Sequence, residues 1–269
     1  MDRLREKVRK LLKEGKVAGY LGYLMKDSHP LPHLFTPERL EEVDRAIVAP
    51  GEARYPLDKL LQQLARAYPE ATFAIQVRGC DERGLNELYK WDQLDPEKVV
   101  LVGVACPQEQ ADYCECPGPW PSVVDYGEKC QPVPQSRRVS RIEALSGEEA
   151  FQEWLGHFNK CVKCYGCRDI CPMCFCKECS LEHPDLMSTG LVPPDTIFQL
   201  VRAIHMAGRC IDCGLCEENC PADIPLRVLY KKGNALVKDL FDYDTGSPEA
   251  GPSPWKMLGE EATLETKPM

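Results

Sequence analysis

The spacing of apolar residues in the first half of the chain predicts helices that alternate with strands. Apolar residues recur at helical spacing between charged ones, which predicts helices over residues 2–14, 56–67 and 82–94. Short apolar runs between turn residues predict strands, over residues 17–24, 46–49, 72–80 and 99–106. The proline-rich stretch that contains His29 and His33 is expected to be a surface loop. Strand, helix and strand with short links form a right-handed parallel unit, so we expect a small, partly parallel sheet.

The second half of the chain is predicted to contain helices separated by irregular segments. Proline, serine and other turn residues predict irregular connections, over residues 117–141 and 184–194. Helical spacing returns further on, over residues 146–158, 195–207 and 225–240, the last interrupted at Gly233. These patterns suggest an α/β domain, a cysteine-rich domain and an acidic, proline-rich tail, over residues 1–135, 136–240 and 241–269.

One cysteine pattern occurs twice in the cysteine-rich domain. It reads Cys-x2-Cys-x2-Cys-x3-Cys-Pro and ends first at Pro172 and then at Pro221. This is the spacing of bacterial two-cluster ferredoxins, in which the fourth cysteine of each run binds the other cluster. A tetrahedral zinc site would leave part of the pattern unused, and disulfides would require an oxidising compartment. We therefore expect a C-terminal ferredoxin-like domain with a helical insert, and an α+β fold for the whole chain.

The ferredoxin spacing assigns eight cysteines to two 4Fe-4S clusters. The first set is Cys161, Cys164, Cys167 and Cys220. The second set is Cys210, Cys213, Cys216 and Cys171.

A third group of cysteines follows the two predicted parallel strands. Cys80 and Cys106 end these strands, and ligands of open α/β sheets collect at the carboxyl ends of strands. Cys114 and Cys116 come shortly afterwards. We expect these four residues, the third set, to hold a third 4Fe-4S cluster, with Cys130 as an alternative fourth ligand. The competing interpretation is a group of buried, unreactive thiols.

The remaining cysteines form a short run after the first ferredoxin pattern. Cys174, Cys176 and Cys179 bring the total to sixteen cysteines, which divides into four sets of four. A fourth cluster completed by Cys130 or another upstream cysteine is one interpretation. Zinc with one exogenous ligand is the other.

Composition narrows the classes of function. The net charge of −9 argues against a nucleic-acid partner and suits docking on a basic protein surface. No apolar run approaches membrane-spanning length, and the charged first residues do not form a signal peptide. We therefore expect a cytoplasmic protein without direct membrane insertion. Neither a dinucleotide-binding glycine motif nor a P-loop is present in the sequence.

Three stretches carry a resemblance to a known family. Residues 78–80 read Arg-Gly-Cys before a helix, residues 102–106 read Val-Gly-Val-Ala-Cys, and residues 164–179 and 208–225 carry the ferredoxin patterns. The first two resemble the Gly-Thr-Pro-Cys and Gly-Leu-Phe-Cys segments of the β-subunit family of coenzyme F420-reducing hydrogenase and F420-dependent formate dehydrogenase. The third resembles the ferredoxin portion of formate dehydrogenase β subunits and of heterodisulfide-reductase-linked proteins.

The resemblance implies an FAD next to a cluster, with Cys80 and Cys106 among the ligands of that cluster. Cys114 and Cys116 stand where the family has a Cys-x2-Cys pair, and the segment before the ferredoxin part is shorter than FAD binding requires. We expect a member that keeps the clusters and lacks the flavin.

The function implied is an iron-sulfur electron-transfer subunit of a multi-subunit oxidoreductase, without catalytic residues of its own. It would link a catalytic subunit, of the formate dehydrogenase, hydrogenase or carbon monoxide dehydrogenase type, to a flavin-containing or heterodisulfide-reductase-like partner. The alternative is an enzyme, a flavin-bearing β subunit that itself reduces F420 or a similar acceptor. A structural module held together by zinc is a third interpretation.

Overall fold

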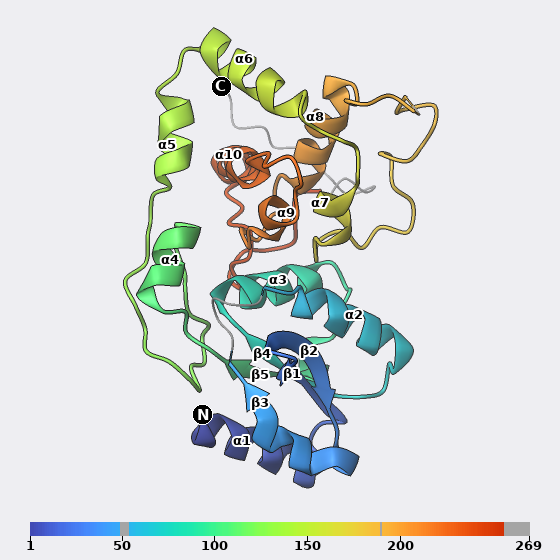
Figure 1. Cartoon of the computed structure of the whole chain (residues 1–269), viewed down its shortest axis with the longest axis vertical. Coiled ribbons are helices and arrows are strands. Elements are labelled where there is room, and N and C mark those ends of the chain that lie inside the picture. The colour runs from blue at the N-terminus through green and yellow to red at the C-terminus, as the bar shows by residue number, and fades with distance from the viewer. Residues whose placement is uncertain (49–53, 189, 256–269) are drawn as a thin grey trace. The chain divides into compact units, whose positions relative to one another are not determined.

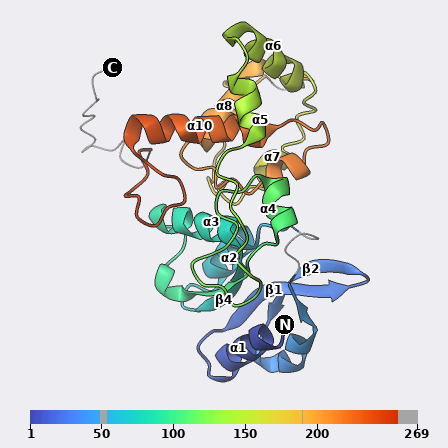
Figure 2. The ribbon, with the colours of Figure 1, turned by 90° about the vertical axis from the view of Figure 1, so that its left-hand side faces the viewer.

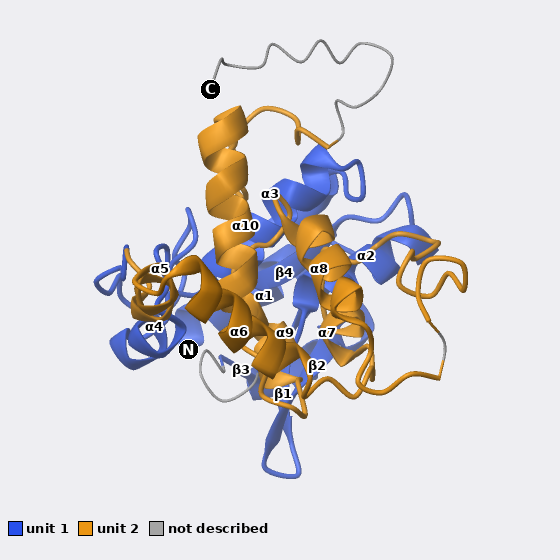
Figure 3. Ribbon diagram, turned by 90° about the horizontal axis from the view of Figure 1, so that it is seen from above, with its two compact units in different colours: residues 1–134 blue, residues 135–269 orange. Residues whose placement is uncertain are grey.

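The computed structural model describes residues 1–48, 54–188 and 190–255. The chain divides into two compact units, unit 1 (Met1–Pro134) and unit 2 (Gln135–Met269), which are coloured separately in Figure 3. Among the described residues, no helix is both long enough and apolar enough to cross a bilayer.

Unit 1 contains a mixed sheet whose described strands follow the order β2-β1-β4-β5, with β3 also paired to β1 (Figure 1). The strands β1 (Gly19–Lys26), β4 (Phe73–Val77) and β5 (Val99–Gly103) run parallel to one another. The strands β2 (His29–Phe35) and β3 (Ala46–Ile47) pair antiparallel with β1. The predicted small, partly parallel sheet is therefore confirmed.

Helices cover both faces of this sheet. On one side lie α1 (Asp2–Lys13) and η1 (Pro37–Arg45), and on the other α2 (Leu57–Ala67) and α3 (Gly79–Lys90), as Figures 1 and 2 show. The apolar side of α1 packs on β1, β2, β4 and the end of β5, through the buried residues Leu4, Val8 and Leu12. Their spacing of four residues places them on one face of the helix. The short helices of this unit are η2 (Pro96–Lys98) and α4 (Gln108–Cys114).

The predicted surface loop around His29 and His33 is wrong, because this stretch forms β2. Asp27 and Ser28 both have positive φ and make a tight turn between β1 and β2. The prolines of β2 are tolerated because β2 is an edge strand. His33 is half-buried, and its Nε2 lies 2.8 Å from a carboxylate oxygen of Glu42.

The start of α3 also differs from the prediction of a strand over residues 72–80. The strand β4 ends at Val77 and α3 begins at Gly79. The side chain of Asp81 caps this helix by accepting hydrogen bonds from the backbone N–H and the guanidinium of Arg78, both at 2.8 Å. Arginine is not a residue that signals a helix start, so the pattern placed the boundary too late. Cys80 therefore lies in the first turn of a helix.

Unit 2 is helical within its described residues. Its longer helices are α6 (Gly147–Phe158), α8 (Thr196–Met206) and α10 (Leu226–Phe241), and its shorter ones are α5 (Arg137–Glu143), α7 (Gly166–Asp169) and α9 (Leu215–Glu218). The helix α8 packs against α10, and α7 against α9.

Two predictions for unit 2 are wrong. The helix α5 begins inside the stretch expected to be irregular, where the hydroxyl of Ser136 accepts a hydrogen bond from the backbone N–H of Val139. The helix α10 continues through Gly233, because a residue without a side chain lets α10 approach Ala207 closely.

The first part of the predicted tail also packs on unit 2, since the indole of Trp255 donates a 2.7 Å hydrogen bond to the carbonyl of Ala207. Residues 256–269 of the predicted tail lie outside the described residues.

Candidate metal centres

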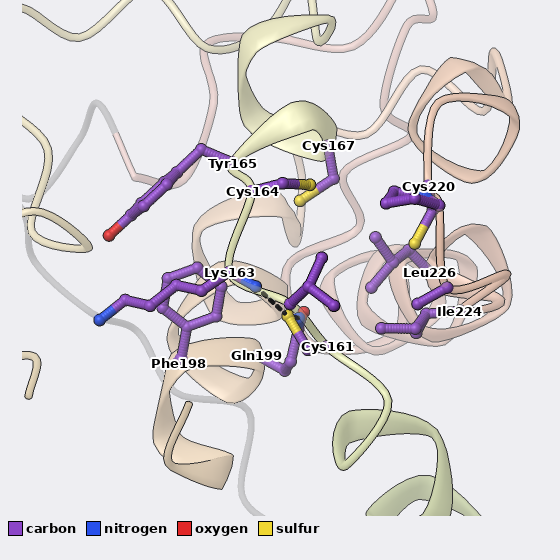
Figure 4. A pocket seen from close by; sticks show the side chains of 13 residues that line it. Cys161, Lys163, Cys164, Tyr165, Cys167, Phe198, Gln199, Cys220, Ile224 and Leu226 are labelled. Atoms are coloured by element: carbon purple, nitrogen blue, oxygen red, sulfur yellow. Dashed lines mark hydrogen bonds between the residues drawn. The ribbon is translucent and has the colours of Figure 1, made fainter. Parts of the chain in front are cut away.

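All four cysteines of the first set line one pocket of unit 2. Cys161, Cys164 and Cys167 come from the loop and short helix of the first pattern, and Cys220 follows α9 in the second. Figure 4 shows their sulfur atoms turned toward a common space. The pocket has a volume of about 340 Å³, part of it open to solvent, and Phe198, Ile224 and Leu226 contribute apolar walls.

Electrostatics within the first set agree with this geometry. Burial raises the pKa of the Cys167 thiol, and the neighbouring Cys161 and Cys220 raise it further. The Cys161 Sγ accepts a 3.1 Å hydrogen bond from the side-chain amide of Gln199 on α8. The structure therefore brings together the residues that the crossed ferredoxin spacing predicts for one cluster.

Three cysteines of the second set, Cys171, Cys210 and Cys216, are buried near one another. Burial raises the pKa of Cys210 to about 12, with contributions from Asp212 and Cys171. Burial also raises the pKa of Cys216, with Cys210 and Cys171 adding to the effect. Cys213 lies on the same loop as Cys210 and is half-buried.

The two ferredoxin patterns adopt the same backbone conformation. Lys163 and Tyr165 have positive φ in the first loop, and Asp212 and Gly214 have positive φ at the equivalent positions of the second. A non-glycine residue in this region costs about 1–3 kcal/mol. Left-handed residues between right-handed ones turn successive N–H groups toward one side, which creates the concave anion sites common around iron-sulfur clusters. Consistent with this, the backbone N–H of Lys163 lies 3.4 Å from the Cys161 Sγ.

The third set also converges, although its members come from separate elements of unit 1. Cys80 lies in the first turn of α3 after β4, and Cys106 follows β5, the parallel neighbour of β4. Burial raises the pKa of Cys106 to about 12, and both Cys116 and Cys114 contribute to the increase. Burial raises the pKa of Cys80 too, with Asp81 as the next cause and Cys106 as a smaller one. The expected position of Cys80 at a strand end was wrong, but its proximity to Cys106 is found.

Cationic and amide side chains surround the third set, and sequence reasoning missed them. The Arg54 guanidinium lies 3.5 Å from the Cys114 Sγ, and that of Arg83 lies 3.8 Å from the Cys116 Sγ. The amide of Gln110 donates a 2.9 Å hydrogen bond to the Cys114 Sγ. Positive charges favour the thiolate form that binds metals. No spacing in the sequence links these arginines to the cysteines, so no local signal could have identified them.

The other four cysteines, Cys130, Cys174, Cys176 and Cys179, each have different neighbours among the described residues. Cys130 belongs to unit 1, where burial raises the pKa of its thiol and the nearby Cys116 adds to the increase. Cys174 shares a hydrogen bond with Cys171, which lowers the pKa of Cys171. Cys176 is exposed, and Cys179 contacts the Arg168 guanidinium. Among the described residues, no three cysteine, histidine or carboxylate side chains are positioned to share a single metal ion.

Comparison with known proteins relates the chain to a group of redox enzymes. It is 34% identical over 174 residues to the F420-dependent formate dehydrogenase subunit beta of Methanocaldococcus jannaschii. It is 46% identical over 102 residues to the F420-dependent formate dehydrogenase 1 subunit beta of Methanococcus maripaludis. The chain is a relative of the β subunits of F420-dependent formate dehydrogenases. The resemblance inferred from its motifs is thereby confirmed, and no family model matches the sequence.

The relationship to these β subunits covers part of each protein. The first match spans 63% of this chain and 41% of the relative, and the second spans 38% and 26%. This chain therefore matches less than half of the length of either formate dehydrogenase β subunit.

The arrangement of the first set is compatible with a 4Fe-4S cluster. A 4Fe-4S cluster takes its thiolates on separate iron atoms, so its ligands surround a volume instead of a point. The first set has this arrangement around its pocket.

Proposed function

We propose that this chain, a relative of formate dehydrogenase β subunits, is an iron-sulfur electron-transfer subunit of a multi-subunit complex. One observation carries the proposal: Cys220 of the second pattern joins the three leading cysteines of the first pattern around one pocket. That exchange is the feature that distinguishes two-cluster ferredoxins from chains with two independent cysteine loops. The common loop conformation of the two patterns adds support.

The proposal assigns a 4Fe-4S cluster to each of the first, second and third sets. When bound, such clusters carry electrons one at a time over a wide range of reduction potentials. The protein supplies thiolates, burial and hydrogen-bond donors. In unit 1 these donors include Arg54, Arg83 and Gln110. Cys174, Cys176 and Cys179 have separate surroundings, so a fourth cluster or a zinc ion is not part of the proposal.

The relationship to formate dehydrogenase β subunits supports a role among the subunits of a redox complex. The chain would pass electrons between a catalytic subunit, of the formate dehydrogenase, hydrogenase or carbon monoxide dehydrogenase type, and a flavin-containing or heterodisulfide-reductase-like partner. The alternative is a flavin-bearing β subunit that reduces F420 itself, and the names of the relatives favour this acceptor. A pocket of unit 1 lined by Phe73, Val99 and the end of α2 does not support that alternative. It lies at the amino-terminal ends of β4 and β5, whereas ligands of open sheets collect at the carboxyl ends.

The test is the content of iron, sulfide, zinc and FAD in protein purified without oxygen. Three 4Fe-4S clusters predict roughly twelve irons per chain and no FAD. Cys106→Ser should lower the iron content by about four and leave the first two clusters intact. Cys176→Ser is the matched control, because Cys176 is exposed and outside the three sets; this variant should keep its iron.

Each other outcome contradicts a defined part of the proposal. Iron content near eight that Cys106→Ser does not change would remove the third cluster. Stoichiometric FAD with reduction of F420 by the isolated chain would favour the enzyme alternative. Protein without iron would refute the electron-transfer proposal altogether.

A further inference from the structure

The helix α8 carries two buried polar side chains into the neighbourhood of the ferredoxin cysteines. Gln199 is 1% exposed and Arg202 is 2% exposed, and they lie almost one turn apart on the same side of the helix. Gln199 donates its 3.1 Å hydrogen bond to the Cys161 Sγ. The guanidinium of Arg202 donates a 3.1 Å hydrogen bond to the backbone carbonyl of Cys167.

Arg202 is a buried charge, and the groups that raise its pKa against burial are Tyr230 and cysteines, with no carboxylate among them in the described residues. Removing a guanidinium from water is costly unless an opposite charge or hydrogen bonds compensate for the loss of hydration. Its Nε atom is buried without a hydrogen-bond partner in the described part of the chain. The guanidinium carbon of Arg202 lies 5.7 Å from the ring centroid of Tyr230 on α10.

Tyr230 presents a second donor in the same place. Its side chain is 1% exposed, and its hydroxyl is buried with no hydrogen-bond partner within the described residues. Orphaned buried donors are rare because each costs free energy. These two donors lie near the cysteines of the ferredoxin patterns, where the sulfur atoms of a bound cluster would supply acceptors.

The neighbours of this pair belong to both ferredoxin sets. Arg202 contacts Cys167 of the first set, through the hydrogen bond to its backbone carbonyl. The side chain of Arg202 also lies close enough to interact with Cys171 of the second set. Tyr230 lies close enough to interact electrostatically with Cys167 and Cys171 as well.

We propose that Arg202, supported by Tyr230, sets the reduction potentials of both ferredoxin-type clusters by donating hydrogen bonds and placing one positive charge between them. This inference rests on the proposed function. A cluster held by four thiolates is an anion, and reduction adds a further negative charge, so a fixed cation nearby favours the reduced state. Hydrogen bonds to sulfur act in the same direction. Gln199 donates its hydrogen bond to Cys161, so it affects the potential of the first cluster only.

The test is a potentiometric titration of the intact, anaerobically purified chain, followed by electron paramagnetic resonance. Arg202→Gln should lower both potentials, making reduction of each cluster at least about tenfold less favourable, which is about 59 mV for one electron. Arg202→Lys retains the charge and should restore most of the shift. Gln199→Met should lower the potential of one cluster only, and this identifies the first set.

Arg141→Gln is the control for the loss of one positive charge. Arg141 pairs with Glu153 and is exposed, so solvent and salt screen its charge. Its removal should leave both potentials unchanged. Tyr230→Phe removes only the hydroxyl and should lower both potentials by less than Arg202→Gln does.

The outcomes separate this inference from the proposed function. Full iron content with unchanged potentials in Arg202→Gln overturns the role of Arg202 and leaves the electron-transfer proposal standing. Wild-type protein without iron refutes the proposed function and this inference together. If Arg202→Gln does not retain iron, Tyr230→Phe decides: lowered potentials of both clusters support the inference, and unchanged ones overturn it.

Discussion

A single methyl group at Gly79 should disturb the third set of cysteines. Gly79 opens α3 one residue before Cys80, and a Cβ atom there would lie 2.0 Å from the carbonyl oxygen of Gly118. Real Cβ atoms do not approach closer than 3.0 Å, so the two backbones would have to separate by at least 3.0 − 2.0 = 1.0 Å. Because the obstacle is backbone, a change of side-chain rotamer cannot relieve it.

The cost follows from what the displaced segment holds. The carbonyl of Gly118 accepts a 3.0 Å hydrogen bond from Arg83, and that of Pro119 accepts one of 2.9 Å from the backbone N–H of Cys106. Overpacking of this kind costs about 1–3 kcal/mol. For a unit of this size that corresponds to a fall in the thermal midpoint of roughly 3–15 °C. The same movement separates Cys116 from Cys80, so we also expect less iron to be bound.

The assay is thermal unfolding of Gly79→Ala by circular dichroism, at one heating rate because Tm depends on scan rate when unfolding is irreversible, together with iron analysis. Gly118→Ala is the matched control: its Cβ would meet only the flexible end of Arg83, at 3.1 Å. It should retain the wild-type iron content and a midpoint close to wild type. A change of less than about 1 °C in Gly79→Ala, with full iron, would show that the close approach described here is wrong.

Three further substitutions test other parts of the structure. Asp212→Asn keeps a residue suited to positive φ but removes the carboxylate that pairs with buried Arg227. It should therefore destabilise unit 2 by about 3 kcal/mol and lower the iron content. Wild-type stability in urea titrations would contradict the pairing. Leu88→Ala empties a fully buried position on α3 and should cost about 2–5 kcal/mol, and an unchanged denaturation midpoint would contradict that burial. Ser136→Ala removes the N-cap acceptor of α5 and should cost about 1 kcal/mol, whereas Ser136→Asn should restore the midpoint.

Much of the fold was predictable because it depends on local patterns. The spacing of Leu4, Val8 and Leu12 predicted α1, and the apolar runs before Cys80 and Cys106 predicted the parallel strands β4 and β5. The errors arose where a tertiary contact outweighs a local rule. The prolines predicted a loop where β2 lies, but this stretch is a strand because pairing with β1 is possible at a sheet edge. Gly233 argued for a break in α10, whereas packing against Ala207 makes use of the missing side chain.

The sequence by itself determined the two loops that carry the repeated cysteine pattern, because a spacing of two or three residues is a local property of the backbone. Their common pattern of positive φ at equivalent positions follows from the same local spacing. The tertiary structure decided which distant groups meet. It brings Cys80, Cys106, Cys114 and Cys116 together from separate elements, and it places Arg202 and Tyr230 beside cysteines of both ferredoxin sets. These contacts depend on how whole helices and strands pack, so no short stretch of sequence encodes them.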